Sequence, residues 1–154
     1  MNDMDKQFEI LLVEDNQDDA KLATRALEKR NLTKRLMWVQ DGAEAMDFLL
    51  ARGKYIKRNK SKRPKVVLLD LNLPKVDGIQ VLQNIRLNRE LEDLPVVVMT
   101  SSEIEKDKLK SELLGVNAYI TKPLDEQSFI KAVCEIQLYW HFFNEPPAAL
   151  MRKN

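Results

Sequence analysis

The chain has 154 residues, of which 32% are charged, and its formal net charge is +1. This length suits one domain with a sizeable core and leaves no room for a second, and the balanced charge argues against nucleic-acid binding over the whole surface. The single cysteine, Cys134, excludes an internal disulfide. No apolar run approaches the roughly 18 residues of a membrane-spanning helix. Residues 1–7 are polar and are expected to be disordered. Because they also lack the apolar stretch of a signal peptide, we expect a cytoplasmic protein.

Short apolar segments alternate with helix-length patterns along the chain. The predicted strands are residues 10–13, 36–39, 66–69, 95–99 and 118–120. The predicted helices are residues 18–30, 43–51, 78–87, 103–114, with Gly115 as the C-cap, and 125 to about 143. The apolar runs are continuous, which is typical of parallel strands covered on both faces, and the charged start of 36–39 indicates a strand near the edge. Five strand–helix repeats predict an α/β domain with a doubly wound parallel sheet.

Acidic residues follow two of the predicted strands. Glu14 and Asp15 come directly after the first strand, and Asp70 ends the third. In a doubly wound sheet these strand ends lie together at the edge where ligands bind. Three neighbouring carboxylates raise one another's pKa unless a cation neutralises them. All-oxygen ligands suit Mg²⁺, so the sequence predicts a magnesium pocket.

A hydroxyl and a lysine follow the fourth and fifth predicted strands. The fourth strand ends in Thr100 and Ser101, and the fifth leads into Lys122. An acidic metal pocket facing a lysine and a hydroxyl fits phosphoryl transfer, in which charge must be stabilised and groups aligned. A carboxylate can act as the nucleophile and form an acyl phosphate. Each residue alone also has a structural explanation as a helix cap, a turn residue or a solvated side chain, and only their conjunction indicates this chemistry.

The motifs around these residues resemble the response-regulator receiver domains of two-component signalling. They occur in the family's order and read Leu11-Leu12-Val13-Glu14-Asp15-Asn16, Leu68-Leu69-Asp70-Leu71-Asn72-Leu73-Pro74, Asp77-Gly78, Val98-Met99-Thr100-Ser101 and Ile120-Thr121-Lys122-Pro123. The resemblance implies a flavodoxin-like sheet of five parallel strands in the order 2-1-3-4-5, with helices on both faces. The receiver domain is expected over residues 8–143, followed by a tail over 144–154.

The resemblance also implies a role for each site residue. Asp70 resembles the phosphoacceptor, and the implied Mg²⁺ ligands are Glu14, Asp15, Asp70 and the backbone carbonyl of Asn72. The implied phosphate-binding switch residues are Thr100, Ser101 and Lys122, with Tyr119 as the aromatic that responds to Thr100 and Pro123 joined to Lys122 by a cis peptide. The phosphodonor is expected to be a histidine kinase. The protein is expected to be a phosphoacceptor switch rather than an enzyme.

Motifs near the end of the chain resemble one subgroup of this family. Leu138-Tyr139-Trp140 and Asn144-Glu145-Pro146-Pro147, together with the long loop before the third predicted strand, resemble the phytochrome-associated response regulators. These are single-domain receivers that partner bacteriophytochrome-type kinases. Only a few residues follow the last predicted helix, so no effector or DNA-binding domain is expected. Output is then expected through protein contacts or a phosphorelay.

The last predicted helix carries two apolar ridges. One ridge suits the core, and the second consists of Ile130, Cys134, Leu138 and Phe142. One core cannot bury both sides of a surface helix. We expect the second ridge to form a homodimer interface together with the fifth strand, the alternative being a loop or tail that covers it.

Residues 52–65 contain eight Lys or Arg residues and no acid. We expect a solvated, self-repelling loop, and the alternatives are a docking patch for an acidic kinase surface or, more weakly, a nucleic-acid contact. Two rivals to the receiver function also remain open. One is a metal-dependent phosphatase with an aspartyl nucleophile, which the lack of a cap-sized insertion disfavours. The other is a scaffold of the same fold that is never phosphorylated, which the intact acids, Thr100 and Lys122 disfavour.

Overall fold

The computed structural model describes residues 8–29, 31 and 35–135. Within them the strands are β1 (Ile10–Val13), β2 (Leu36–Val39), β3 (Val66–Asp70), β4 (Val96–Thr100) and β5 (Ala118–Thr121). The helices are α1 (Gln17–Glu28), α2 (Gly42–Leu49), the short 3-10 helix η3 (Gly53–Tyr55), α3 (Gly78–Leu87), α4 (Glu103–Ser111) and α5 (Glu126–Glu135).

The strands form one parallel sheet in the order β2-β1-β3-β4-β5, which confirms the predicted topology. Val13 of β1 lies beside Leu69 of β3, and Asp70 lies beside Met99 of β4. The ends of these three central strands are therefore level with one another. The residues that follow them come out at the same edge, where crossover folds bind their ligands.

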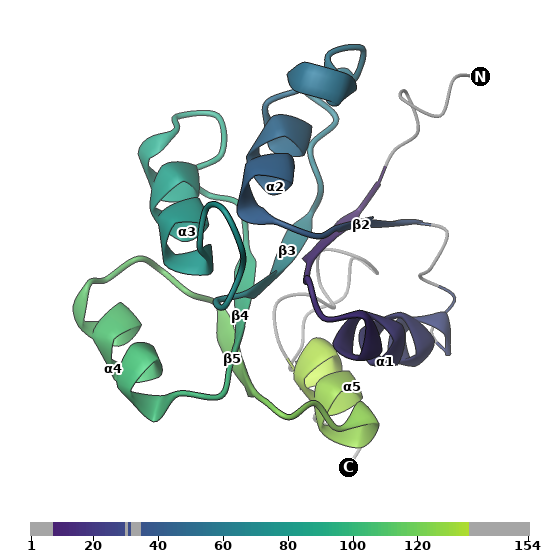
Figure 1. Cartoon of the computed structure of the whole chain (residues 1–154), viewed down its shortest axis with the longest axis vertical. Coiled ribbons are helices and arrows are strands. Elements are labelled where there is room, and N and C mark those ends of the chain that lie inside the picture. The colour runs from purple at the N-terminus through teal and green to yellow at the C-terminus, as the bar shows by residue number, and fades with distance from the viewer. Residues whose placement is uncertain (1–7, 30, 32–34, 136–154) are drawn as a thin grey trace.

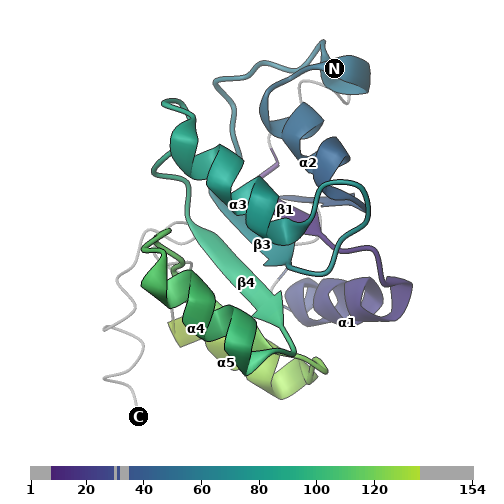
Figure 2. The same ribbon diagram turned by 60° about the vertical axis from the view of Figure 1, so that its left-hand side comes forward.

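Helices cover both faces of the sheet (Figures 1 and 2). One core layer packs the sheet against α2, α3 and α4, and the other packs it against α1 and α5. Alternate residues of one strand serve the two layers, because successive side chains point to opposite faces: Leu11 belongs to the first layer and Leu12 to the second. Burial on both faces explains why the strand runs are apolar without interruption.

Several predicted helix ends differ from the structure by one to three residues, and the differences at α4 and α5 concern specific predictions. α4 ends at Ser111 with Glu112 as its C-cap, so the prediction of Gly115 as the cap is wrong. The chain turns earlier because Leu113 adopts a left-handed φ of 55°, and Gly115 provides a second such residue three positions later than the cap. α5 begins at Glu126, and the predicted remainder of that helix after Glu135 lies outside the described residues. Among the described helices, none combines the length and the apolar character needed to cross a bilayer.

Most of the basic segment 52–65 is exposed, as its composition predicts, but two of its larger side chains are not solvated. Tyr55 and Arg58 are buried, with exposed fractions of 4% and 6%. The Arg58 guanidinium stacks 3.8 Å from the centre of the Phe48 ring, donates a hydrogen bond to the Phe48 carbonyl and donates another to the Lys62 carbonyl at 2.9 Å. The segment is thus anchored on α2.

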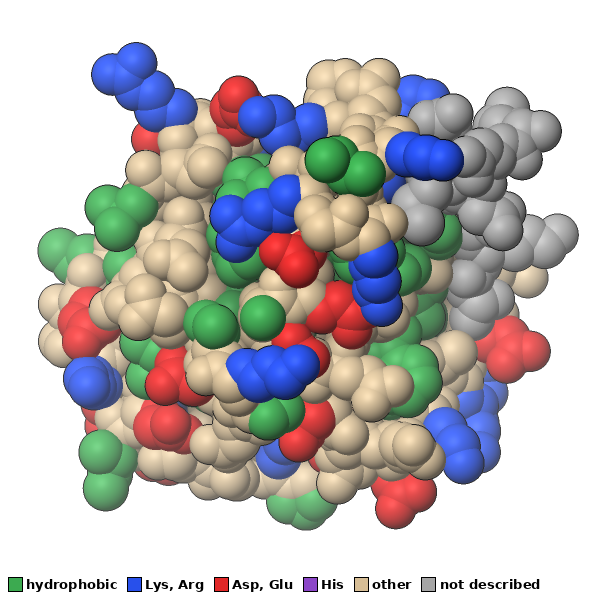
Figure 3. Space-filling view, turned by 45° about the horizontal axis from the view of Figure 1, so that its top comes forward, with side chains coloured by type: hydrophobic (Ala, Val, Ile, Leu, Met, Phe, Trp, Pro, Cys, Tyr) green, Lys and Arg blue, Asp and Glu red, His purple; other side chains and the backbone are tan. Residues whose placement is uncertain are grey.

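Most of the other basic side chains of this segment are paired with acids from elsewhere in the fold. Ion pairs join Arg52 to Asp47, Lys54 to Glu44, Lys60 to Glu90, Arg63 to Asp93 and Lys65 to Glu9, with N–O distances of 2.7 to 3.6 Å. On the face shown in Figure 3, basic side chains are interspersed with acidic and apolar ones. This pairing removes the basis for a self-repelling loop and weakens the docking-patch alternative.

Replacing Arg58 by alanine is expected to lower the free energy of unfolding by about 2–4 kcal/mol, because the change removes two hydrogen bonds and a stacked cation from a buried position. Urea unfolding followed by circular dichroism measures the loss. Lys57→Ala, at an exposed position of the same segment, serves as the control and is expected to change stability by less than about 0.5 kcal/mol. Equal stability of the two variants would show that the segment is not anchored through Arg58.

Candidate functional site

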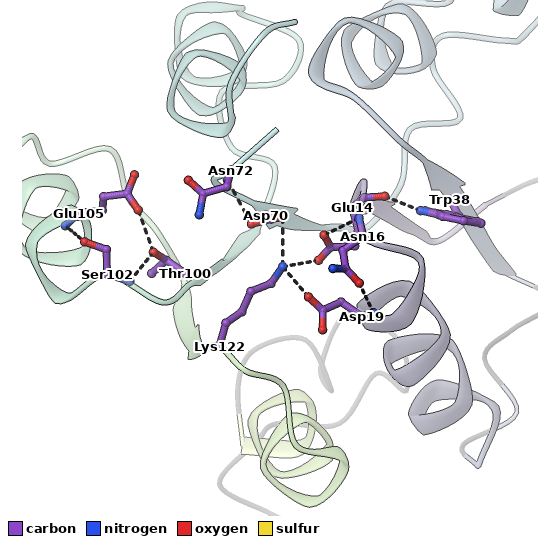
Figure 4. A network of polar contacts seen from close by, with 10 residues as sticks. All are labelled: Glu14, Asn16, Asp19, Trp38, Asp70, Asn72, Thr100, Ser102, Glu105 and Lys122. Atoms are coloured by element: carbon purple, nitrogen blue, oxygen red, sulfur yellow. Dashed lines mark hydrogen bonds and ion pairs between the residues drawn. The ribbon is translucent and has the colours of Figure 1, made fainter. Parts of the chain in front are cut away.

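Three carboxylates meet at the carboxyl edge of the sheet, and Figure 4 shows two of them, Glu14 and Asp70. Glu14 and Asp15 follow β1, and Asp70 ends β3, the strand beside it. One oxygen of each carboxylate lies within 4.8 Å of the others. Glu14 and Asp70 are buried, whereas Asp15 is exposed. The structure therefore brings together the three acids that the sequence singles out.

Lys122 extends from the end of β5 into this cluster. Its Nζ lies 2.8 Å from Glu14 Oε1, 2.9 Å from Asp19 Oδ2 and 3.1 Å from Asp70 Oδ2. The peptide bond between Lys122 and Pro123 is cis. Asp19 is in the first turn of α1, which Asn16 caps through a hydrogen bond to the Asp19 amide. One ammonium group therefore contacts carboxylates from three different elements.

The burial of this cluster shifts the proton affinities of its members. Burial raises the pKa of Glu14 to about 7, and its hydrogen-bonding contact with Asp70 adds to the rise, while Lys122 opposes it. For Lys122, burial lowers the pKa, but its contacts with Glu14, Asp19 and Asp70 outweigh burial and the net pKa is raised. Near neutral pH the pocket therefore holds a firmly charged lysine beside a glutamate that is close to its titration point.

The backbone of Glu14 is tied to the edge of the sheet. Trp38, on the edge strand β2, donates its indole N–H to the Glu14 carbonyl at 2.7 Å. The indole is 36% exposed, so it connects the buried acid to the surface. The side-chain carboxylate of Glu14 is held separately, by the backbone amide of Asn16, which donates to Glu14 Oε2 at 3.2 Å.

The loop after β3 is held close to the site by a glycine. Gly78, the first residue of α3, donates its amide to the Leu71 carbonyl at 3.0 Å. A Cβ at this position would lie 2.4 Å from the backbone oxygen of Asp70, so only glycine allows the approach. Within the loop, the amide of Asn72 donates to Asp70 Oδ1 at 3.1 Å. The carboxylate of Asp70 is thus oriented from the loop as well as from Lys122.

Thr100 closes the site on the β4 side. Its hydroxyl donates to Glu105 Oε1 at 3.1 Å and accepts the Ser102 amide at 3.0 Å. Ser102 caps α4 by accepting the Glu105 amide at 3.1 Å. Ser101 is exposed. The helix cap is therefore Ser102, one residue beyond the predicted pair of hydroxyl residues.

The donor set fits a divalent cation. Carboxylate oxygens from Glu14, Asp15 and Asp70 are hard ligands of the kind that such ions prefer. Glu14 Oε1 is buried and accepts no aligned hydrogen bond from the described residues, although it forms an ion pair with Lys122. A buried oxygen in this state has a free lone pair for a metal.

Comparison with known protein families identifies the family to which this chain belongs. The family model for the response regulator receiver domain matches residues 10–134. The chain belongs to the response-regulator receiver family. The receiver domain is 41% identical to the probable methanogenesis regulatory protein FilR2 of Methanothrix harundinacea over 140 residues, covering 91% of this chain and 88% of the relative. It is 42% identical to response regulator Rcp1 of Synechocystis sp. over 131 residues, covering 85% and 87%.

Comparison with solved structures leads to the same family. The bacteriophytochrome response regulator RtBRR superposes with a TM-score of 0.78 at 44% identity, covering 93% of this receiver and 86% of that chain. The Mn²⁺-bound form of response regulator Rcp1 superposes with a TM-score of 0.70 at 40% identity, covering 88% and 94%. The receiver is therefore similar over most of its length to phytochrome-associated regulators.

The remaining predicted residues lie around this site. Tyr119 is partly buried on β5 and packs against the core layer of α2, α3 and α4. Ile130, predicted for a dimer interface, packs partly buried against the other core layer. Cys134 lies in α5, and the interface residues Leu138 and Phe142 lie outside the described residues. The dimer therefore stays a prediction.

Two acids of the receiver site, Asp19 and Glu105, were not predicted. Both are the third residue of a helix whose N-cap is Asn16 or Ser102, a position from which a side chain reaches back toward the cap. Both caps follow a strand that ends at the site. An acid three residues after such a cap could therefore have been predicted from the sequence to lie near the site.

Proposed function

We propose that this receiver domain accepts a phosphoryl group on Asp70 from the phosphohistidine of a histidine kinase, with Mg²⁺ as cofactor. The observation that carries the proposal is the position of the Asp70 carboxylate, which is 2% exposed and lies between two further acids and the ammonium of Lys122. The ammonium of Lys122 can balance part of the charge of an incoming phosphate, and the two further acids can hold a cation that balances more of it.

In the proposed reaction an Asp70 carboxylate oxygen attacks the phosphorus of phosphohistidine. The P–N bond breaks, its electron pair stays on the imidazole nitrogen, and the products are an acyl phosphate and free histidine. Lys122 and Thr100 are then positioned to meet phosphoryl oxygens as a point charge and a hydroxyl donor. Glu14, Asp15, Asp70 and the carbonyl of Asn72 would hold Mg²⁺, which when bound supplies neutralisation of the transferred charge.

The added phosphate carries roughly −2 charge at pH 7. Because Lys122 already contacts Glu14 and Asp19, it would turn from these acids to the phosphoryl oxygens. Its movement and that of Thr100 would reach the ends of β5 and β4. The output is then a changed surface for protein–protein signalling or a further phosphorelay step.

The identity with RtBRR and Rcp1 supports a phytochrome-type histidine kinase as the donor. The similar identity with FilR2 supports a different signal, one connected with methanogenesis regulation. Transfer of labelled phosphate from purified, autophosphorylated bacteriophytochrome to the receiver would favour the first, and failure of transfer from that kinase would favour the second.

The proposal is tested by incubating the protein with acetyl phosphate and Mg²⁺ and locating the modification by mass spectrometry. One phosphoryl group is expected on Asp70, with none in Asp70→Asn and none in the presence of EDTA. Asp107→Asn, at an exposed position on α4, is the matched control and is expected to label like the parent protein. An unlabelled parent would support the scaffold alternative, and turnover of phosphomonoesters would support the phosphatase alternative.

A further inference from the structure

The first turn of α4 contacts the end of β4 through a glutamate that has no part in the proposed metal or phosphate chemistry. Glu105 is partly buried, and its carboxylate accepts the hydroxyl proton of Thr100 at 3.1 Å. Thr100 itself is buried and lies one residue beyond the position paired with Asp70. Figure 4 shows Glu105 and Ser102 approaching Thr100 from α4, on the side away from Lys122.

A threonine hydroxyl has one proton and can donate only one hydrogen bond at a time. In this structure that proton is used by Glu105. If Thr100 donates to a phosphoryl oxygen on Asp70, it must release Glu105. The two hydrogen bonds are therefore mutually exclusive, and the stability of the first opposes the formation of the second.

The released carboxylate has a second donor within reach. In a capping box, the N-cap hydroxyl accepts the amide of the third helical residue, and the glutamate at that position accepts the N-cap amide. Only the first of these bonds is made here, from the Glu105 amide to Ser102 Oγ at 3.1 Å. The Ser102 amide donates instead to Thr100 Oγ1 at 3.0 Å, the same atom that donates to Glu105.

We propose that Glu105 is a latch on Thr100. In the unphosphorylated protein its carboxylate holds the hydroxyl proton of Thr100 away from Asp70. When Thr100 turns to the phosphoryl group, Glu105 accepts the Ser102 amide that Thr100 leaves, and the capping box closes. Glu105 is a positioning residue that acts through Thr100, and the proposal rests on the proposed function of Asp70.

The latch connects the phosphorylation site to the surface of α4. Lys106, the residue after Glu105, lies with its Nζ 5.5 Å from the centre of the Tyr119 ring, and Lys110 of the same helix lies at the same distance. A rearranged first turn of α4 therefore changes the cations over Tyr119. The route from Asp70 to this aromatic runs through Thr100, Glu105 and α4.

The test uses beryllofluoride, a phosphoryl analogue, with Mg²⁺ and the full-length protein, and measures its affinity by titration calorimetry. Glu105→Ala is expected to bind beryllofluoride roughly three- to tenfold more tightly than the parent, which corresponds to the loss of one competing hydrogen bond. Glu105→Asp is expected to tighten binding as well, because its carboxylate is one methylene too short to hold Thr100 while the charge remains. Glu103→Ala, an exposed acid of the same helical turn, is the matched control and is expected to bind like the parent.

Hydrogen exchange of the Ser102 amide gives a second readout. With beryllofluoride bound, this amide is expected to stay protected in the parent and to exchange at least about tenfold faster in Glu105→Ala, which has no carboxylate to accept it. Parent affinity in both Glu105 variants, or equal protection of Ser102, would overturn the latch. A parent protein that binds no beryllofluoride at all would instead contradict the proposed function of Asp70.

Discussion

Replacing Lys122 by methionine is expected to lower the free energy of unfolding of the metal-free protein by about 3 kcal/mol at pH 8, because removing one partner of a buried ion pair leaves the others uncompensated. The Lys122 ammonium is the cation that contacts the carboxylates of Glu14, Asp19 and Asp70. Methionine has similar length but no charge, so the three acids then repel one another. A divalent cation placed among them is expected to restore most of the loss.

Urea unfolding in EDTA and in excess Mg²⁺ measures both effects. The affinity for Mg²⁺ is expected to rise by about tenfold in Lys122→Met, since the ion no longer competes with the ammonium for the same oxygens. Lys29→Met is the control, because Lys29 also forms a close ion pair, 2.7 Å from Glu126, but is largely exposed. Such a surface pair contributes less than about 1 kcal/mol. A loss in Lys122→Met that Mg²⁺ does not reduce would contradict the explanation.

The stability of the metal-free protein is expected to fall as the pH rises from about 5 to above 7. The pKa of Glu14 is about 7 in the folded protein against 4.5 for a free glutamate, so the folded state binds a proton more tightly than the unfolded state. Between these two values the unfolded chain gives up its proton first, and each rise in pH favours unfolding. The full effect is at most about 3 kcal/mol and is complete above pH 7.

Metal binding is expected to show the opposite dependence. A cation requires the ionised Glu14 carboxylate, so the affinity for Mg²⁺ is expected to fall by about tenfold for each pH unit below 7. Unfolding curves and Mg²⁺ titrations between pH 5 and 8 measure both trends, with Glu14→Gln as the variant that lacks the titrating group. The slope of stability with pH is expected to be flatter in Glu14→Gln. A slope identical to that of the parent would assign the titration to another residue.

The sequence predicts the sheet well because its signals are local. Continuous apolar runs identify the strands, the repeated strand–helix order identifies the doubly wound topology, and the acids at the strand ends identify the pocket. Parallel strands place these ends at one edge of the sheet whatever the loops do, and the strand order implied by the family resemblance then puts Glu14 beside Asp70.

The features that escaped prediction depend on the directions in which helices and side chains point, whether the contacting residues are near or far apart in the sequence. Asp19 and Glu105 lie in helices, and their contacts with Lys122 and Thr100 follow from the direction in which each helix leaves its strand. The burial of Arg58 depends on its stacking on Phe48. Much of the positive charge of segment 52–65 is paired with acids far away in the sequence, such as Asp93 for Arg63 and Glu9 for Lys65, and the composition of the segment does not reveal these partners.

The indole of Trp38 gives the pocket an optical reporter of its own. Its N–H is bonded to the backbone of Glu14, and its ring is partly in contact with water. The fluorescence of an indole depends on the polarity around it and on the electric field along its ring. A change of charge at the acids is therefore expected to change the emission wavelength and intensity of Trp38. Binding of a cation at the buried site is therefore expected to change the fluorescence of Trp38 at the edge of the sheet, without any attached dye.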